Sequence, residues 1–276
     1  MMRNLAATLA WPFAALHSAL RPGIRILMYH RVLPTANGDQ LCVSSGRFEA
    51  QMAWLASNRS VIRLSDIPAL LSEPRRPPED AVAVTFDDGY LDNLLHALPI
   101  LRRHGIPSTI FVSPDFADQT HRHPRYVGER TRLHLDWGEI RSMLEDSLVE
   151  IGSHTCTHPF LRQLDDGSAE REIVESKRRI EAKLDRSVDW FCYPSGDFGV
   201  REESLVRAAG YVGAVSVAPG VNRRGTSLTA LRRTEITDQD AEREFRLKCR
   251  GAFDPFHWLL HRRREARFVR LAEARQ

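Results

Sequence analysis

The stretch Ala81–Gly89 (AVAVTFDDG) sets both the expected fold and the expected chemistry of the chain. Its first six residues are apolar or β-branched, which is typical of a strand buried on both faces. Two adjacent carboxylates, Asp87 and Asp88, end this strand, and Gly89 permits a sharp turn after them. An Asp-Asp-Gly turn can also be chemically inert. The rest of the chain must therefore decide whether these acids form part of a site.

Short β-rich runs alternate with longer helical patterns along most of the chain. The predicted strands are Ile24–His30, Val61–Leu64, Ala81–Phe86, Thr109–Ser113, Val149–Gly152, Trp190–Tyr193 and Val212–Val217. The predicted helices are Phe48–Ser57, Leu91–His104, Trp137–Glu145, Ala169–Leu184 and Glu202–Ala209. Such alternation favours parallel strands with helical crossovers. We expect an α/β fold, a distorted and nearly closed (β/α) barrel, with an open doubly wound sheet as the alternative.

Length and composition are compatible with one such barrel and exclude other classes. The chain has 276 residues, and a (β/α) barrel commonly occupies about 250. Neither a dinucleotide-binding G-x-G-x-x-G after the first strand nor a P-loop occurs, and we expect no nucleic-acid partner. The four cysteines form no C-x-x-C pair, which excludes zinc-finger spacing.

A second polar cluster follows another apolar strand. In Ser153–His158 (SHTCTH), His154 and His158 stand four residues apart, a spacing that can chelate a metal if the segment makes a helical turn. The alternative is two unrelated surface histidines. Combined with one Asp of the first cluster, the histidines would bind Zn²⁺ and leave a position open for water. The other Asp could deprotonate that water.

These two motifs together resemble the polysaccharide deacetylases of the NodB-homology type, carbohydrate esterase family 4. The resemblance runs from about Ile24 to Ile236 and is closest to members that act on exopolysaccharides. It implies that Asp87 is the general base, and that Asp88, His154 and His158 bind Zn²⁺ or another divalent transition metal. It also implies a distorted (β/α) barrel and the removal of acetyl groups from N-acetylhexosamines.

The third motif of that family differs in this chain. The family pattern Arg-x-Pro-aromatic-Gly corresponds here to Cys192–Gly196 (CYPSG), so the Arg that would orient the base is replaced by Cys192. We expect Cys192 to be a small core residue. The backbone N–H of Ser195 remains a candidate oxyanion donor, because it needs no particular side chain. We assign Tyr193 to substrate binding. We assign Trp137 to it too, because aromatic faces stack on sugars, with a core position as its alternative.

The general acid is the least specified residue of the site. Many family members use a late Leu-x-His, but the only literal match, ending at His261, lies in an Arg-rich helical pattern. His30 ends the first predicted strand, in a run (MYHR) similar to the exopolysaccharide branch. We predict that His30 is the general acid, with a strand-capping histidine as the alternative.

The two ends of the chain are interpreted separately from the domain at 24–236. Residues 1–23 predict an uncleaved helix, and a signal peptide is the alternative. Residues 237–276 predict a basic helical segment; from Asn222 to Gln276 there are 14 Lys and Arg against 8 Asp and Glu, or +6. A basic amphipathic helix can contact an anionic membrane, while a solvated face that closes the barrel is the alternative. We expect a cytoplasmic protein or one at the inner face of the membrane; secretion stays open.

Two functional alternatives remain beside a metal-dependent deacetylase of an N-acetylated glycan. A glycan-binding protein with little turnover is favoured by the missing Arg but opposed by the intact Asp and His motifs. A phosphatase with an aspartyl nucleophile usually spaces its two acids by one residue, whereas Asp87 and Asp88 are adjacent.

Overall fold

The computed structural model describes residues 23–73 and 80–273. Its main sheet has eight strands, and every pair in it is parallel. The strands lie in the order β10-β1-β5-β6-β7-β8-β9, and β4 adds to β5. They are β1 (Arg25–Tyr29), β4 (Ser60–Val61), β5 (Ala81–Phe86), β6 (Ser108–Val112), β7 (Val149–Ser153), β8 (Trp190–Cys192), β9 (Gly213–Val215) and β10 (Thr234–Glu235).

The sheet curls into a distorted barrel that closes only loosely. Leu231 forms an isolated parallel bridge with Val215 of β9 and exchanges backbone hydrogen bonds with Ala214 and Ser216. Three residues later, Thr234 pairs with Leu27 of β1. One short segment thus joins the two ends of the sheet. The expected distorted (β/α) barrel is confirmed.

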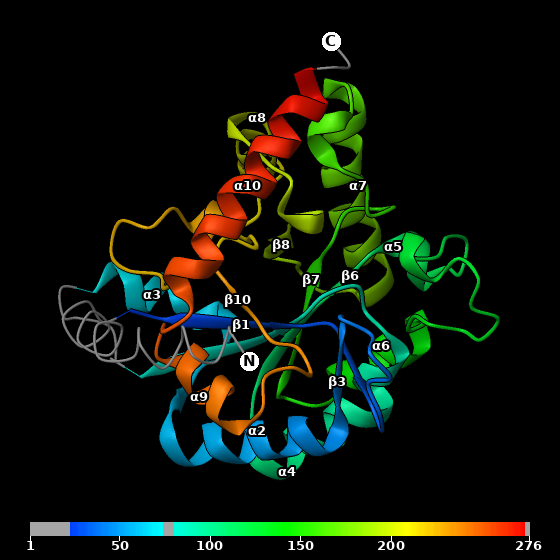
Figure 1. Ribbon diagram of the computed structural model, residues 1–276. Helices are drawn as coiled ribbons and strands as arrows, with labels where there is room; N and C mark the ends of the chain where they lie inside the picture. The colour runs from blue at the N-terminus through cyan, green and yellow to red at the C-terminus, as the bar shows by residue number, and fades with distance from the viewer. Residues whose placement is uncertain (1–22, 74–79, 274–276) are drawn as a thin grey trace.

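Helices cover the outside of the sheet (Figure 1). They are α2 (Ser45–Asn58), α3 (Ile67–Ser72), α4 (Leu98–His104), α5 (Pro114–Ala117), α6 (Trp137–Leu144), α7 (Asp166–Leu184), α8 (Val200–Ala208), α9 (Glu242–Cys249) and α10 (Asp254–Glu273). Asp136 caps α6 and forms a capping box with Glu139, as its sequence predicts. None of the described helices is long and apolar enough to cross a membrane.

All seven predicted strands are present, but the sequence analysis missed β10 and the two-strand sheet of β2 (Arg31–Leu33) and β3 (Cys42–Ser44). The predicted helix Leu91–His104 is also divided: a π-helical turn at Asn93–Ala97 precedes α4. The helix predicted within residues 1–23 lies almost entirely outside the described residues.

Side chains that alternate along the strands form two cores. Ile26, Ala83 and Cys192 belong to a cluster that also contains Phe111 and Trp190. Their strand neighbours, such as Leu27 and Val84, pack in a second and larger cluster with α2, α4, α6 and α7. Cys192 is fully buried, as predicted. The four cysteines are all buried and unpaired.

Candidate active site

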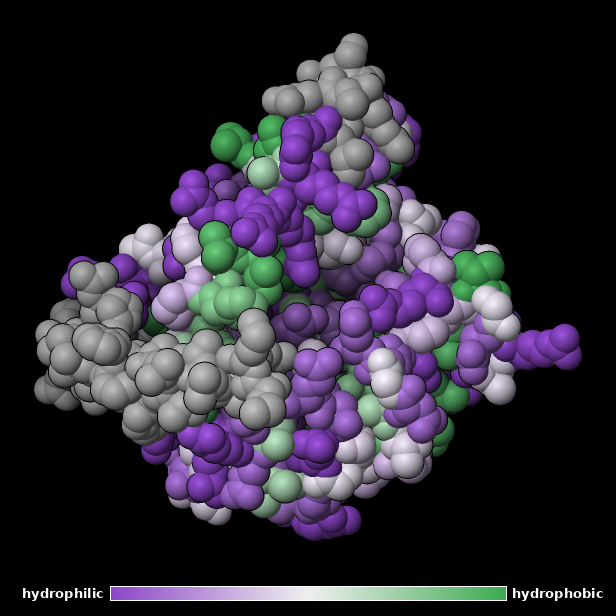
Figure 2. Space-filling view, viewed as in Figure 1, coloured by the Kyte–Doolittle hydropathy of each residue, from purple (hydrophilic) through white to green (hydrophobic). Residues whose placement is uncertain are grey.

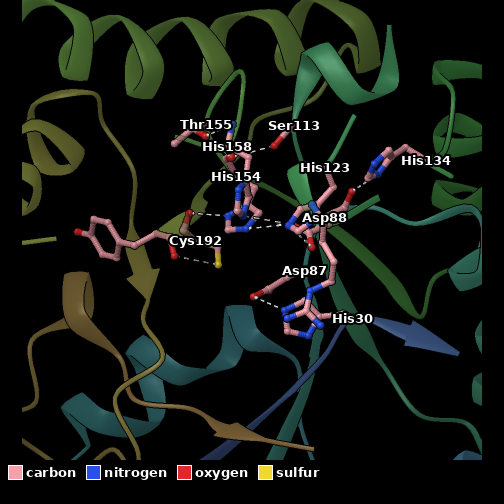
Figure 3. Close-up of polar contacts among 12 residues, drawn as sticks. His30, Asp87, Asp88, Ser113, His123, His134, His154, Thr155, His158 and Cys192 are labelled. Atoms are coloured by element: carbon pink, nitrogen blue, oxygen red, sulfur yellow. Dashed lines mark hydrogen bonds and ion pairs between the residues drawn. The ribbon is translucent and has the colours of Figure 1, made fainter. Parts of the chain in front are cut away.

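The carboxyl ends of the parallel strands meet at one end of the barrel, and the residues predicted to be catalytic or to bind metal gather there. They line one cleft of about 710 Å³. His30 follows β1, Asp87 and Asp88 follow β5, and His154 follows β7. The loop after His154 adds His158, and Ser195 comes from the turn after β8. Figure 3 shows His123, His154 and His158 around Asp88, and His30 beside Asp87.

Asp88, His154 and His158 form a set of donors suited to a divalent metal. Asp88 Oδ1 lies 3.4 Å from Nε2 of His154 and 3.4 Å from Nε2 of His158. All three ligand atoms lie within 4.8 Å of one another. Ligands about 2.1 Å from a tetrahedral zinc ion stand about 3.4 Å apart. The Oδ1 atom is buried and has no hydrogen-bond partner, which a bound cation would remedy.

The tautomer of His154 fits this arrangement. Its Nδ1 lies 2.7 Å from the backbone oxygen of Cys192, which can only accept a hydrogen bond. Nδ1 therefore carries a proton and donates, so Nε2, the nitrogen on the Asp88 side, is the one that can bind a metal. Burial would lower the pKa of His154, but the neighbouring Cys192, Asp88 and Asp87 raise it well above the usual value, so a metal bound at Nε2 would displace a proton. Burial lowers the pKa of His158 to about 3, so its imidazole is neutral at physiological pH. Burial alone would raise the pKa of Asp88, but the interaction with His154 outweighs it and holds the pKa well below the usual value.

The loop that brings the two histidines together is not the helical turn considered above. Thr155 and His158 both adopt left-handed backbone angles, with φ of 63° and 61°. The Thr155 hydroxyl accepts a hydrogen bond from the His158 N–H at 3.0 Å. The carboxylate of Glu172, on α7, accepts the N–H of Cys156 at 2.8 Å. Non-glycine residues at positive φ are uncommon, and here they hold the two candidate ligand histidines in place.

Asp87 is held by an arginine that the sequence analysis did not find. Arg233 donates from both Nη atoms to Asp87, at 2.6 Å to Oδ1 and 2.7 Å to Oδ2. Both side chains are almost wholly buried. Burial would raise the pKa of Asp87, but the Arg233 charge outweighs it and the pKa is lowered. Asp87 therefore remains ionised at neutral pH.

Arg233 also explains the departure at Cys192. One Nη of Arg233 lies 3.1 Å from Cys192 Sγ. The small Cys192 side chain thus leaves room for an arginine that arrives from the segment before β10. Asp87, His154 and Cys192 form a second cluster of metal-ligand type. This cluster is the less suitable one, because Arg233 engages both Asp87 oxygens and burial raises the pKa of the Cys192 thiol.

His30 lies beside Asp87. Its Nε2 is 3.9 Å from Asp87 Oδ2, and its ring lines the cleft. The Asn93 side chain donates to the backbone oxygen of His30 at 2.8 Å. Asn93 begins the π-helical turn, and such turns are frequent at functional sites. The strand end and this hydrogen bond together aim His30 at the cleft.

Two further histidines near the site were missed by the sequence analysis. His123 comes from the polar loop before α6, and its Nε2 lies 3.9 Å from Asp88 Oδ2. His134 donates from Nδ1 to the backbone oxygen of Asp88 at 2.9 Å and stacks on Phe116. Burial lowers the pKa of His134 to about 4, which keeps it a neutral support of Asp88. The density of histidine in this loop (HRH) was the available signal.

Two residues assigned to substrate binding do not reach the cleft, and this corrects their assignment. Tyr193 is fully buried, donates to the backbone oxygen of Thr229 at 2.9 Å and stacks on Phe198. Trp137 lies in the core and donates to Asp118 at 2.6 Å. Tyr193 follows Cys192 directly and points away from the barrel interior, because side chains alternate along a strand.

A barrel with this site defines an enzyme that deacetylates carbohydrates. The chain belongs to the polysaccharide deacetylase family, whose model matches residues 75–214, half of the chain. It is 29% identical over 213 residues to YxkH of Bacillus subtilis (strain 168), which is named for the polysaccharide deacetylases; the match covers 77% of this chain and 71% of YxkH. It is 26% identical over 166 residues to a chitooligosaccharide deacetylase of Rhizobium leguminosarum bv. phaseoli, covering 58% of this chain and 65% of that protein.

Solved structures have the same fold. The deacetylase PplD of Streptococcus pyogenes has a TM-score of 0.72 at 21% identity, over 82% of this chain and 98% of that one. IcaB of Ammonifex degensii has a TM-score of 0.69 at 23% identity, over 84% of this chain and 97% of that one. At these identities the likeness concerns the fold alone.

Proposed function

We propose that this protein is a metal-dependent hydrolase that removes N-acetyl groups from N-acetylhexosamine residues of a polysaccharide or oligosaccharide. The observation that carries the proposal is the buried Asp88 oxygen, which faces two imidazole nitrogens at 3.4 Å without a hydrogen-bond partner. An ionised carboxylate, Asp87, stands directly beside this set. The name of the Rhizobium relative gives an N-acetylated sugar as that protein's substrate class.

Two imidazoles and one carboxylate are ligands typical of Zn²⁺, and related divalent transition metals accept them too. Bound there by Asp88, His154 and His158, the ion would polarise the acetyl carbonyl and lower the pKa of water.

Asp87 is the proposed general base. The two hydrogen bonds from Arg233 fix its carboxylate plane and hold it ionised, so it can accept a proton from the attacking water. An isolated buried carboxylate would instead protonate, because its charge would have no compensation. Arg233 thus acts on the reaction through Asp87 and is a positioning residue.

The remaining roles fall to Ser195 and His30. Ser195 lines the cleft at a φ of 55°, and its backbone N–H would stabilise the developing oxyanion. His30 would protonate the leaving amine, since it lies on the Asp87 side of the cleft. His123 approaches Asp88 instead, and its ring centre lies 5.1 Å from that of His158. The products are acetate and a free amino sugar.

The glycan-binding alternative loses its main support. It depended on the absence of an arginine beside the base, and Arg233 supplies that arginine from the segment before β10.

The test combines a metal measurement with an activity measurement. Purified protein is analysed for bound metal and incubated with a panel of N-acetylated oligosaccharides, and released acetate is measured before and after chelation. We expect about one divalent ion per chain, loss of acetate release after chelation and recovery with Zn²⁺. Full acetate release by metal-free protein would contradict the proposal, and so would the absence of release from every N-acetylated glycan.

A further inference from the structure

Helix α10 lies along the cleft and is fixed to the barrel at separate points (Figure 1). Arg25 of β1 donates to both carboxylate oxygens of Asp254, at 3.0 and 2.9 Å. Two turns from its far end, Glu265 accepts from Arg162 at 3.0 Å, and Phe268 is buried. These contacts fix the helix to the barrel, so it forms a stable part of the cleft wall.

This helix presents three arginines to the cleft that contains the catalytic carboxylates. Arg263, Arg264 and Arg267 line it, and Arg125 lines it from the loop before α6. Figure 2 shows hydrophilic side chains along the C-terminal half of α10, beside the hollow in the middle of the molecule, and hydrophobic side chains along its first half. All four arginines are exposed.

The three helix arginines have no ion-pair partner among the described residues. Within the described parts of the chain, no carboxylate lies within 4.0 Å of Arg263, Arg264 or Arg267, whereas many other arginines have such a partner, for example Arg162 and Arg179. Like charges three or four residues apart on a helix repel each other. A cluster of this kind is stabilised when an anion binds to it.

Acidic residues of the cleft do not provide that anion. The charge of Asp87 is compensated by Arg233, and Asp88 belongs to the metal-binding set. Glu235 is the one other carboxylate among the described residues that line the cleft, against the three arginines of α10; Arg125 lies 3.7 Å from Asp39 and is paired with it. The cleft therefore has a cationic side along α10.

We propose that this cationic side binds a carboxylate or phosphate group of the glycan, so that the substrate is an anionic N-acetylated saccharide. The planar guanidinium group matches both kinds of anion through paired hydrogen bonds. A cleft lined by one sign of charge also concentrates oppositely charged ligands. This inference rests on the deacetylase function proposed above and specifies its substrate.

An anionic membrane is a different partner for the same residues, and the structure favours the saccharide. The arginines line the wall of the cleft that holds Asp87 and His154. The exposed apolar residues Phe256 and Leu259 belong to the same helix but do not line that cleft.

The test compares two double variants of the full-length protein. Arg264→Gln/Arg267→Gln removes two charges from the cleft. Arg262→Gln/Arg270→Gln removes the same charge from exposed positions of the same helix outside the cleft lining. Acetate release is measured with chitotetraose, which is neutral, with a hyaluronan tetrasaccharide, which carries carboxylates, and with N-acetylglucosamine 1-phosphate. Binding of the same three probes is measured by calorimetry on metal-depleted protein, where turnover is prevented.

We expect wild-type protein to prefer at least one anionic probe over chitotetraose, in binding and in kcat/KM. The cleft variant should lose roughly 10- to 100-fold in affinity for that probe, mainly through KM, and should change much less in its activity on chitotetraose. The control variant should behave as wild type. The preference should weaken between about 50 mM and about 500 mM salt, because the arginines are exposed. A preference for the hyaluronan tetrasaccharide would indicate a carboxylate as the bound group, and a preference for N-acetylglucosamine 1-phosphate would indicate a phosphate.

Equal binding of neutral and anionic probes overturns the inference, and so does equal loss in the two variants. Acetate release without a charge preference would leave the deacetylase function standing and refute its anionic substrate. Charge-selective binding without any acetate release would support an anionic ligand and refute the deacetylase function. Binding of anionic vesicles that only the cleft variant loses, with unchanged glycan selectivity, assigns the arginines to a membrane and also overturns the inference.

Discussion

Replacement of Arg233 by Met should destabilise the protein and shift the pH dependence of its activity. Asp87 and Arg233 are 3% and 1% exposed, and two hydrogen bonds of 2.6 and 2.7 Å join them. Removing one partner of a buried ion pair typically costs about 3–5 kcal/mol, because the remaining charge is uncompensated. That is a large share of the about 5–15 kcal/mol that stabilises a typical protein. The free energy of unfolding is measured by urea denaturation.

The sign of the pH effect follows from the causes of the Asp87 pKa. In the wild type, the Arg233 charge lowers this pKa despite burial, so the pair stabilises the fold at neutral pH. That contribution is lost as the pH falls through the lowered pKa. Without Arg233, burial dominates and the pKa of Asp87 rises. The acid limb of the kcat/KM profile should therefore move to higher pH in the variant.

A matched variant separates stability from catalysis. Arg25 is also buried and donates to two oxygens of one carboxylate, that of Asp254, but it does not line the cleft. Arg25→Met should lower stability and leave the pH profile where it is. The double variant Asp87→Asn/Arg233→Met should regain stability without regaining activity, because neither buried charge remains. An acid limb that stays unmoved in Arg233→Met would refute the role of Arg233 as the residue that holds the base ionised.

The other site residues give distinct expected outcomes. His154→Ala and His158→Ala should each lose bound metal and acetate release together; a variant that keeps one tightly bound ion and full turnover would contradict its assignment as a ligand. Asp88→Asn should lose both as well, whereas Asp87→Asn should keep the metal and lose activity, as checked by elemental analysis. His30→Ala should lower kcat by about 10²- to 10⁴-fold with unchanged metal content. An unchanged kcat would indicate that His30 has a structural role.

The barrel and the principal ligands could be predicted from local patterns. Short β-rich runs of four to six residues marked β5, β6 and β7, and the parallel arrangement brought their polar ends to one edge. Arg233, which holds Asp87, could not be found from such local patterns. Arg233 lies 146 residues from Asp87 along the chain, next to a strand of only two residues. A strand that short has no periodicity to detect.

The aromatic assignments were wrong for a different reason. Tyr193 follows β8 directly, and whether its side chain reaches the cleft depends on which face of the sheet it occupies. A strand of three residues does not specify that face. The loop that carries His123 was recognised as a loop, but its position in the fold was not predicted. Its polar composition correctly indicates a loop, but composition does not state which end of the barrel the loop covers.

The position of Arg233 couples Asp87, the proposed general base, to the closure of the barrel. Arg233 stands between Leu231, which bridges to β9, and Thr234, which pairs with β1. Its Nε also donates to the backbone oxygen of Ser216, just after β9, at 2.8 Å. An arginine on the strand that carries Cys192 would be fixed by that strand alone. Here the carboxylate of Asp87 is oriented only when the last strand has joined the first, so the charge that activates the base depends on completion of the fold.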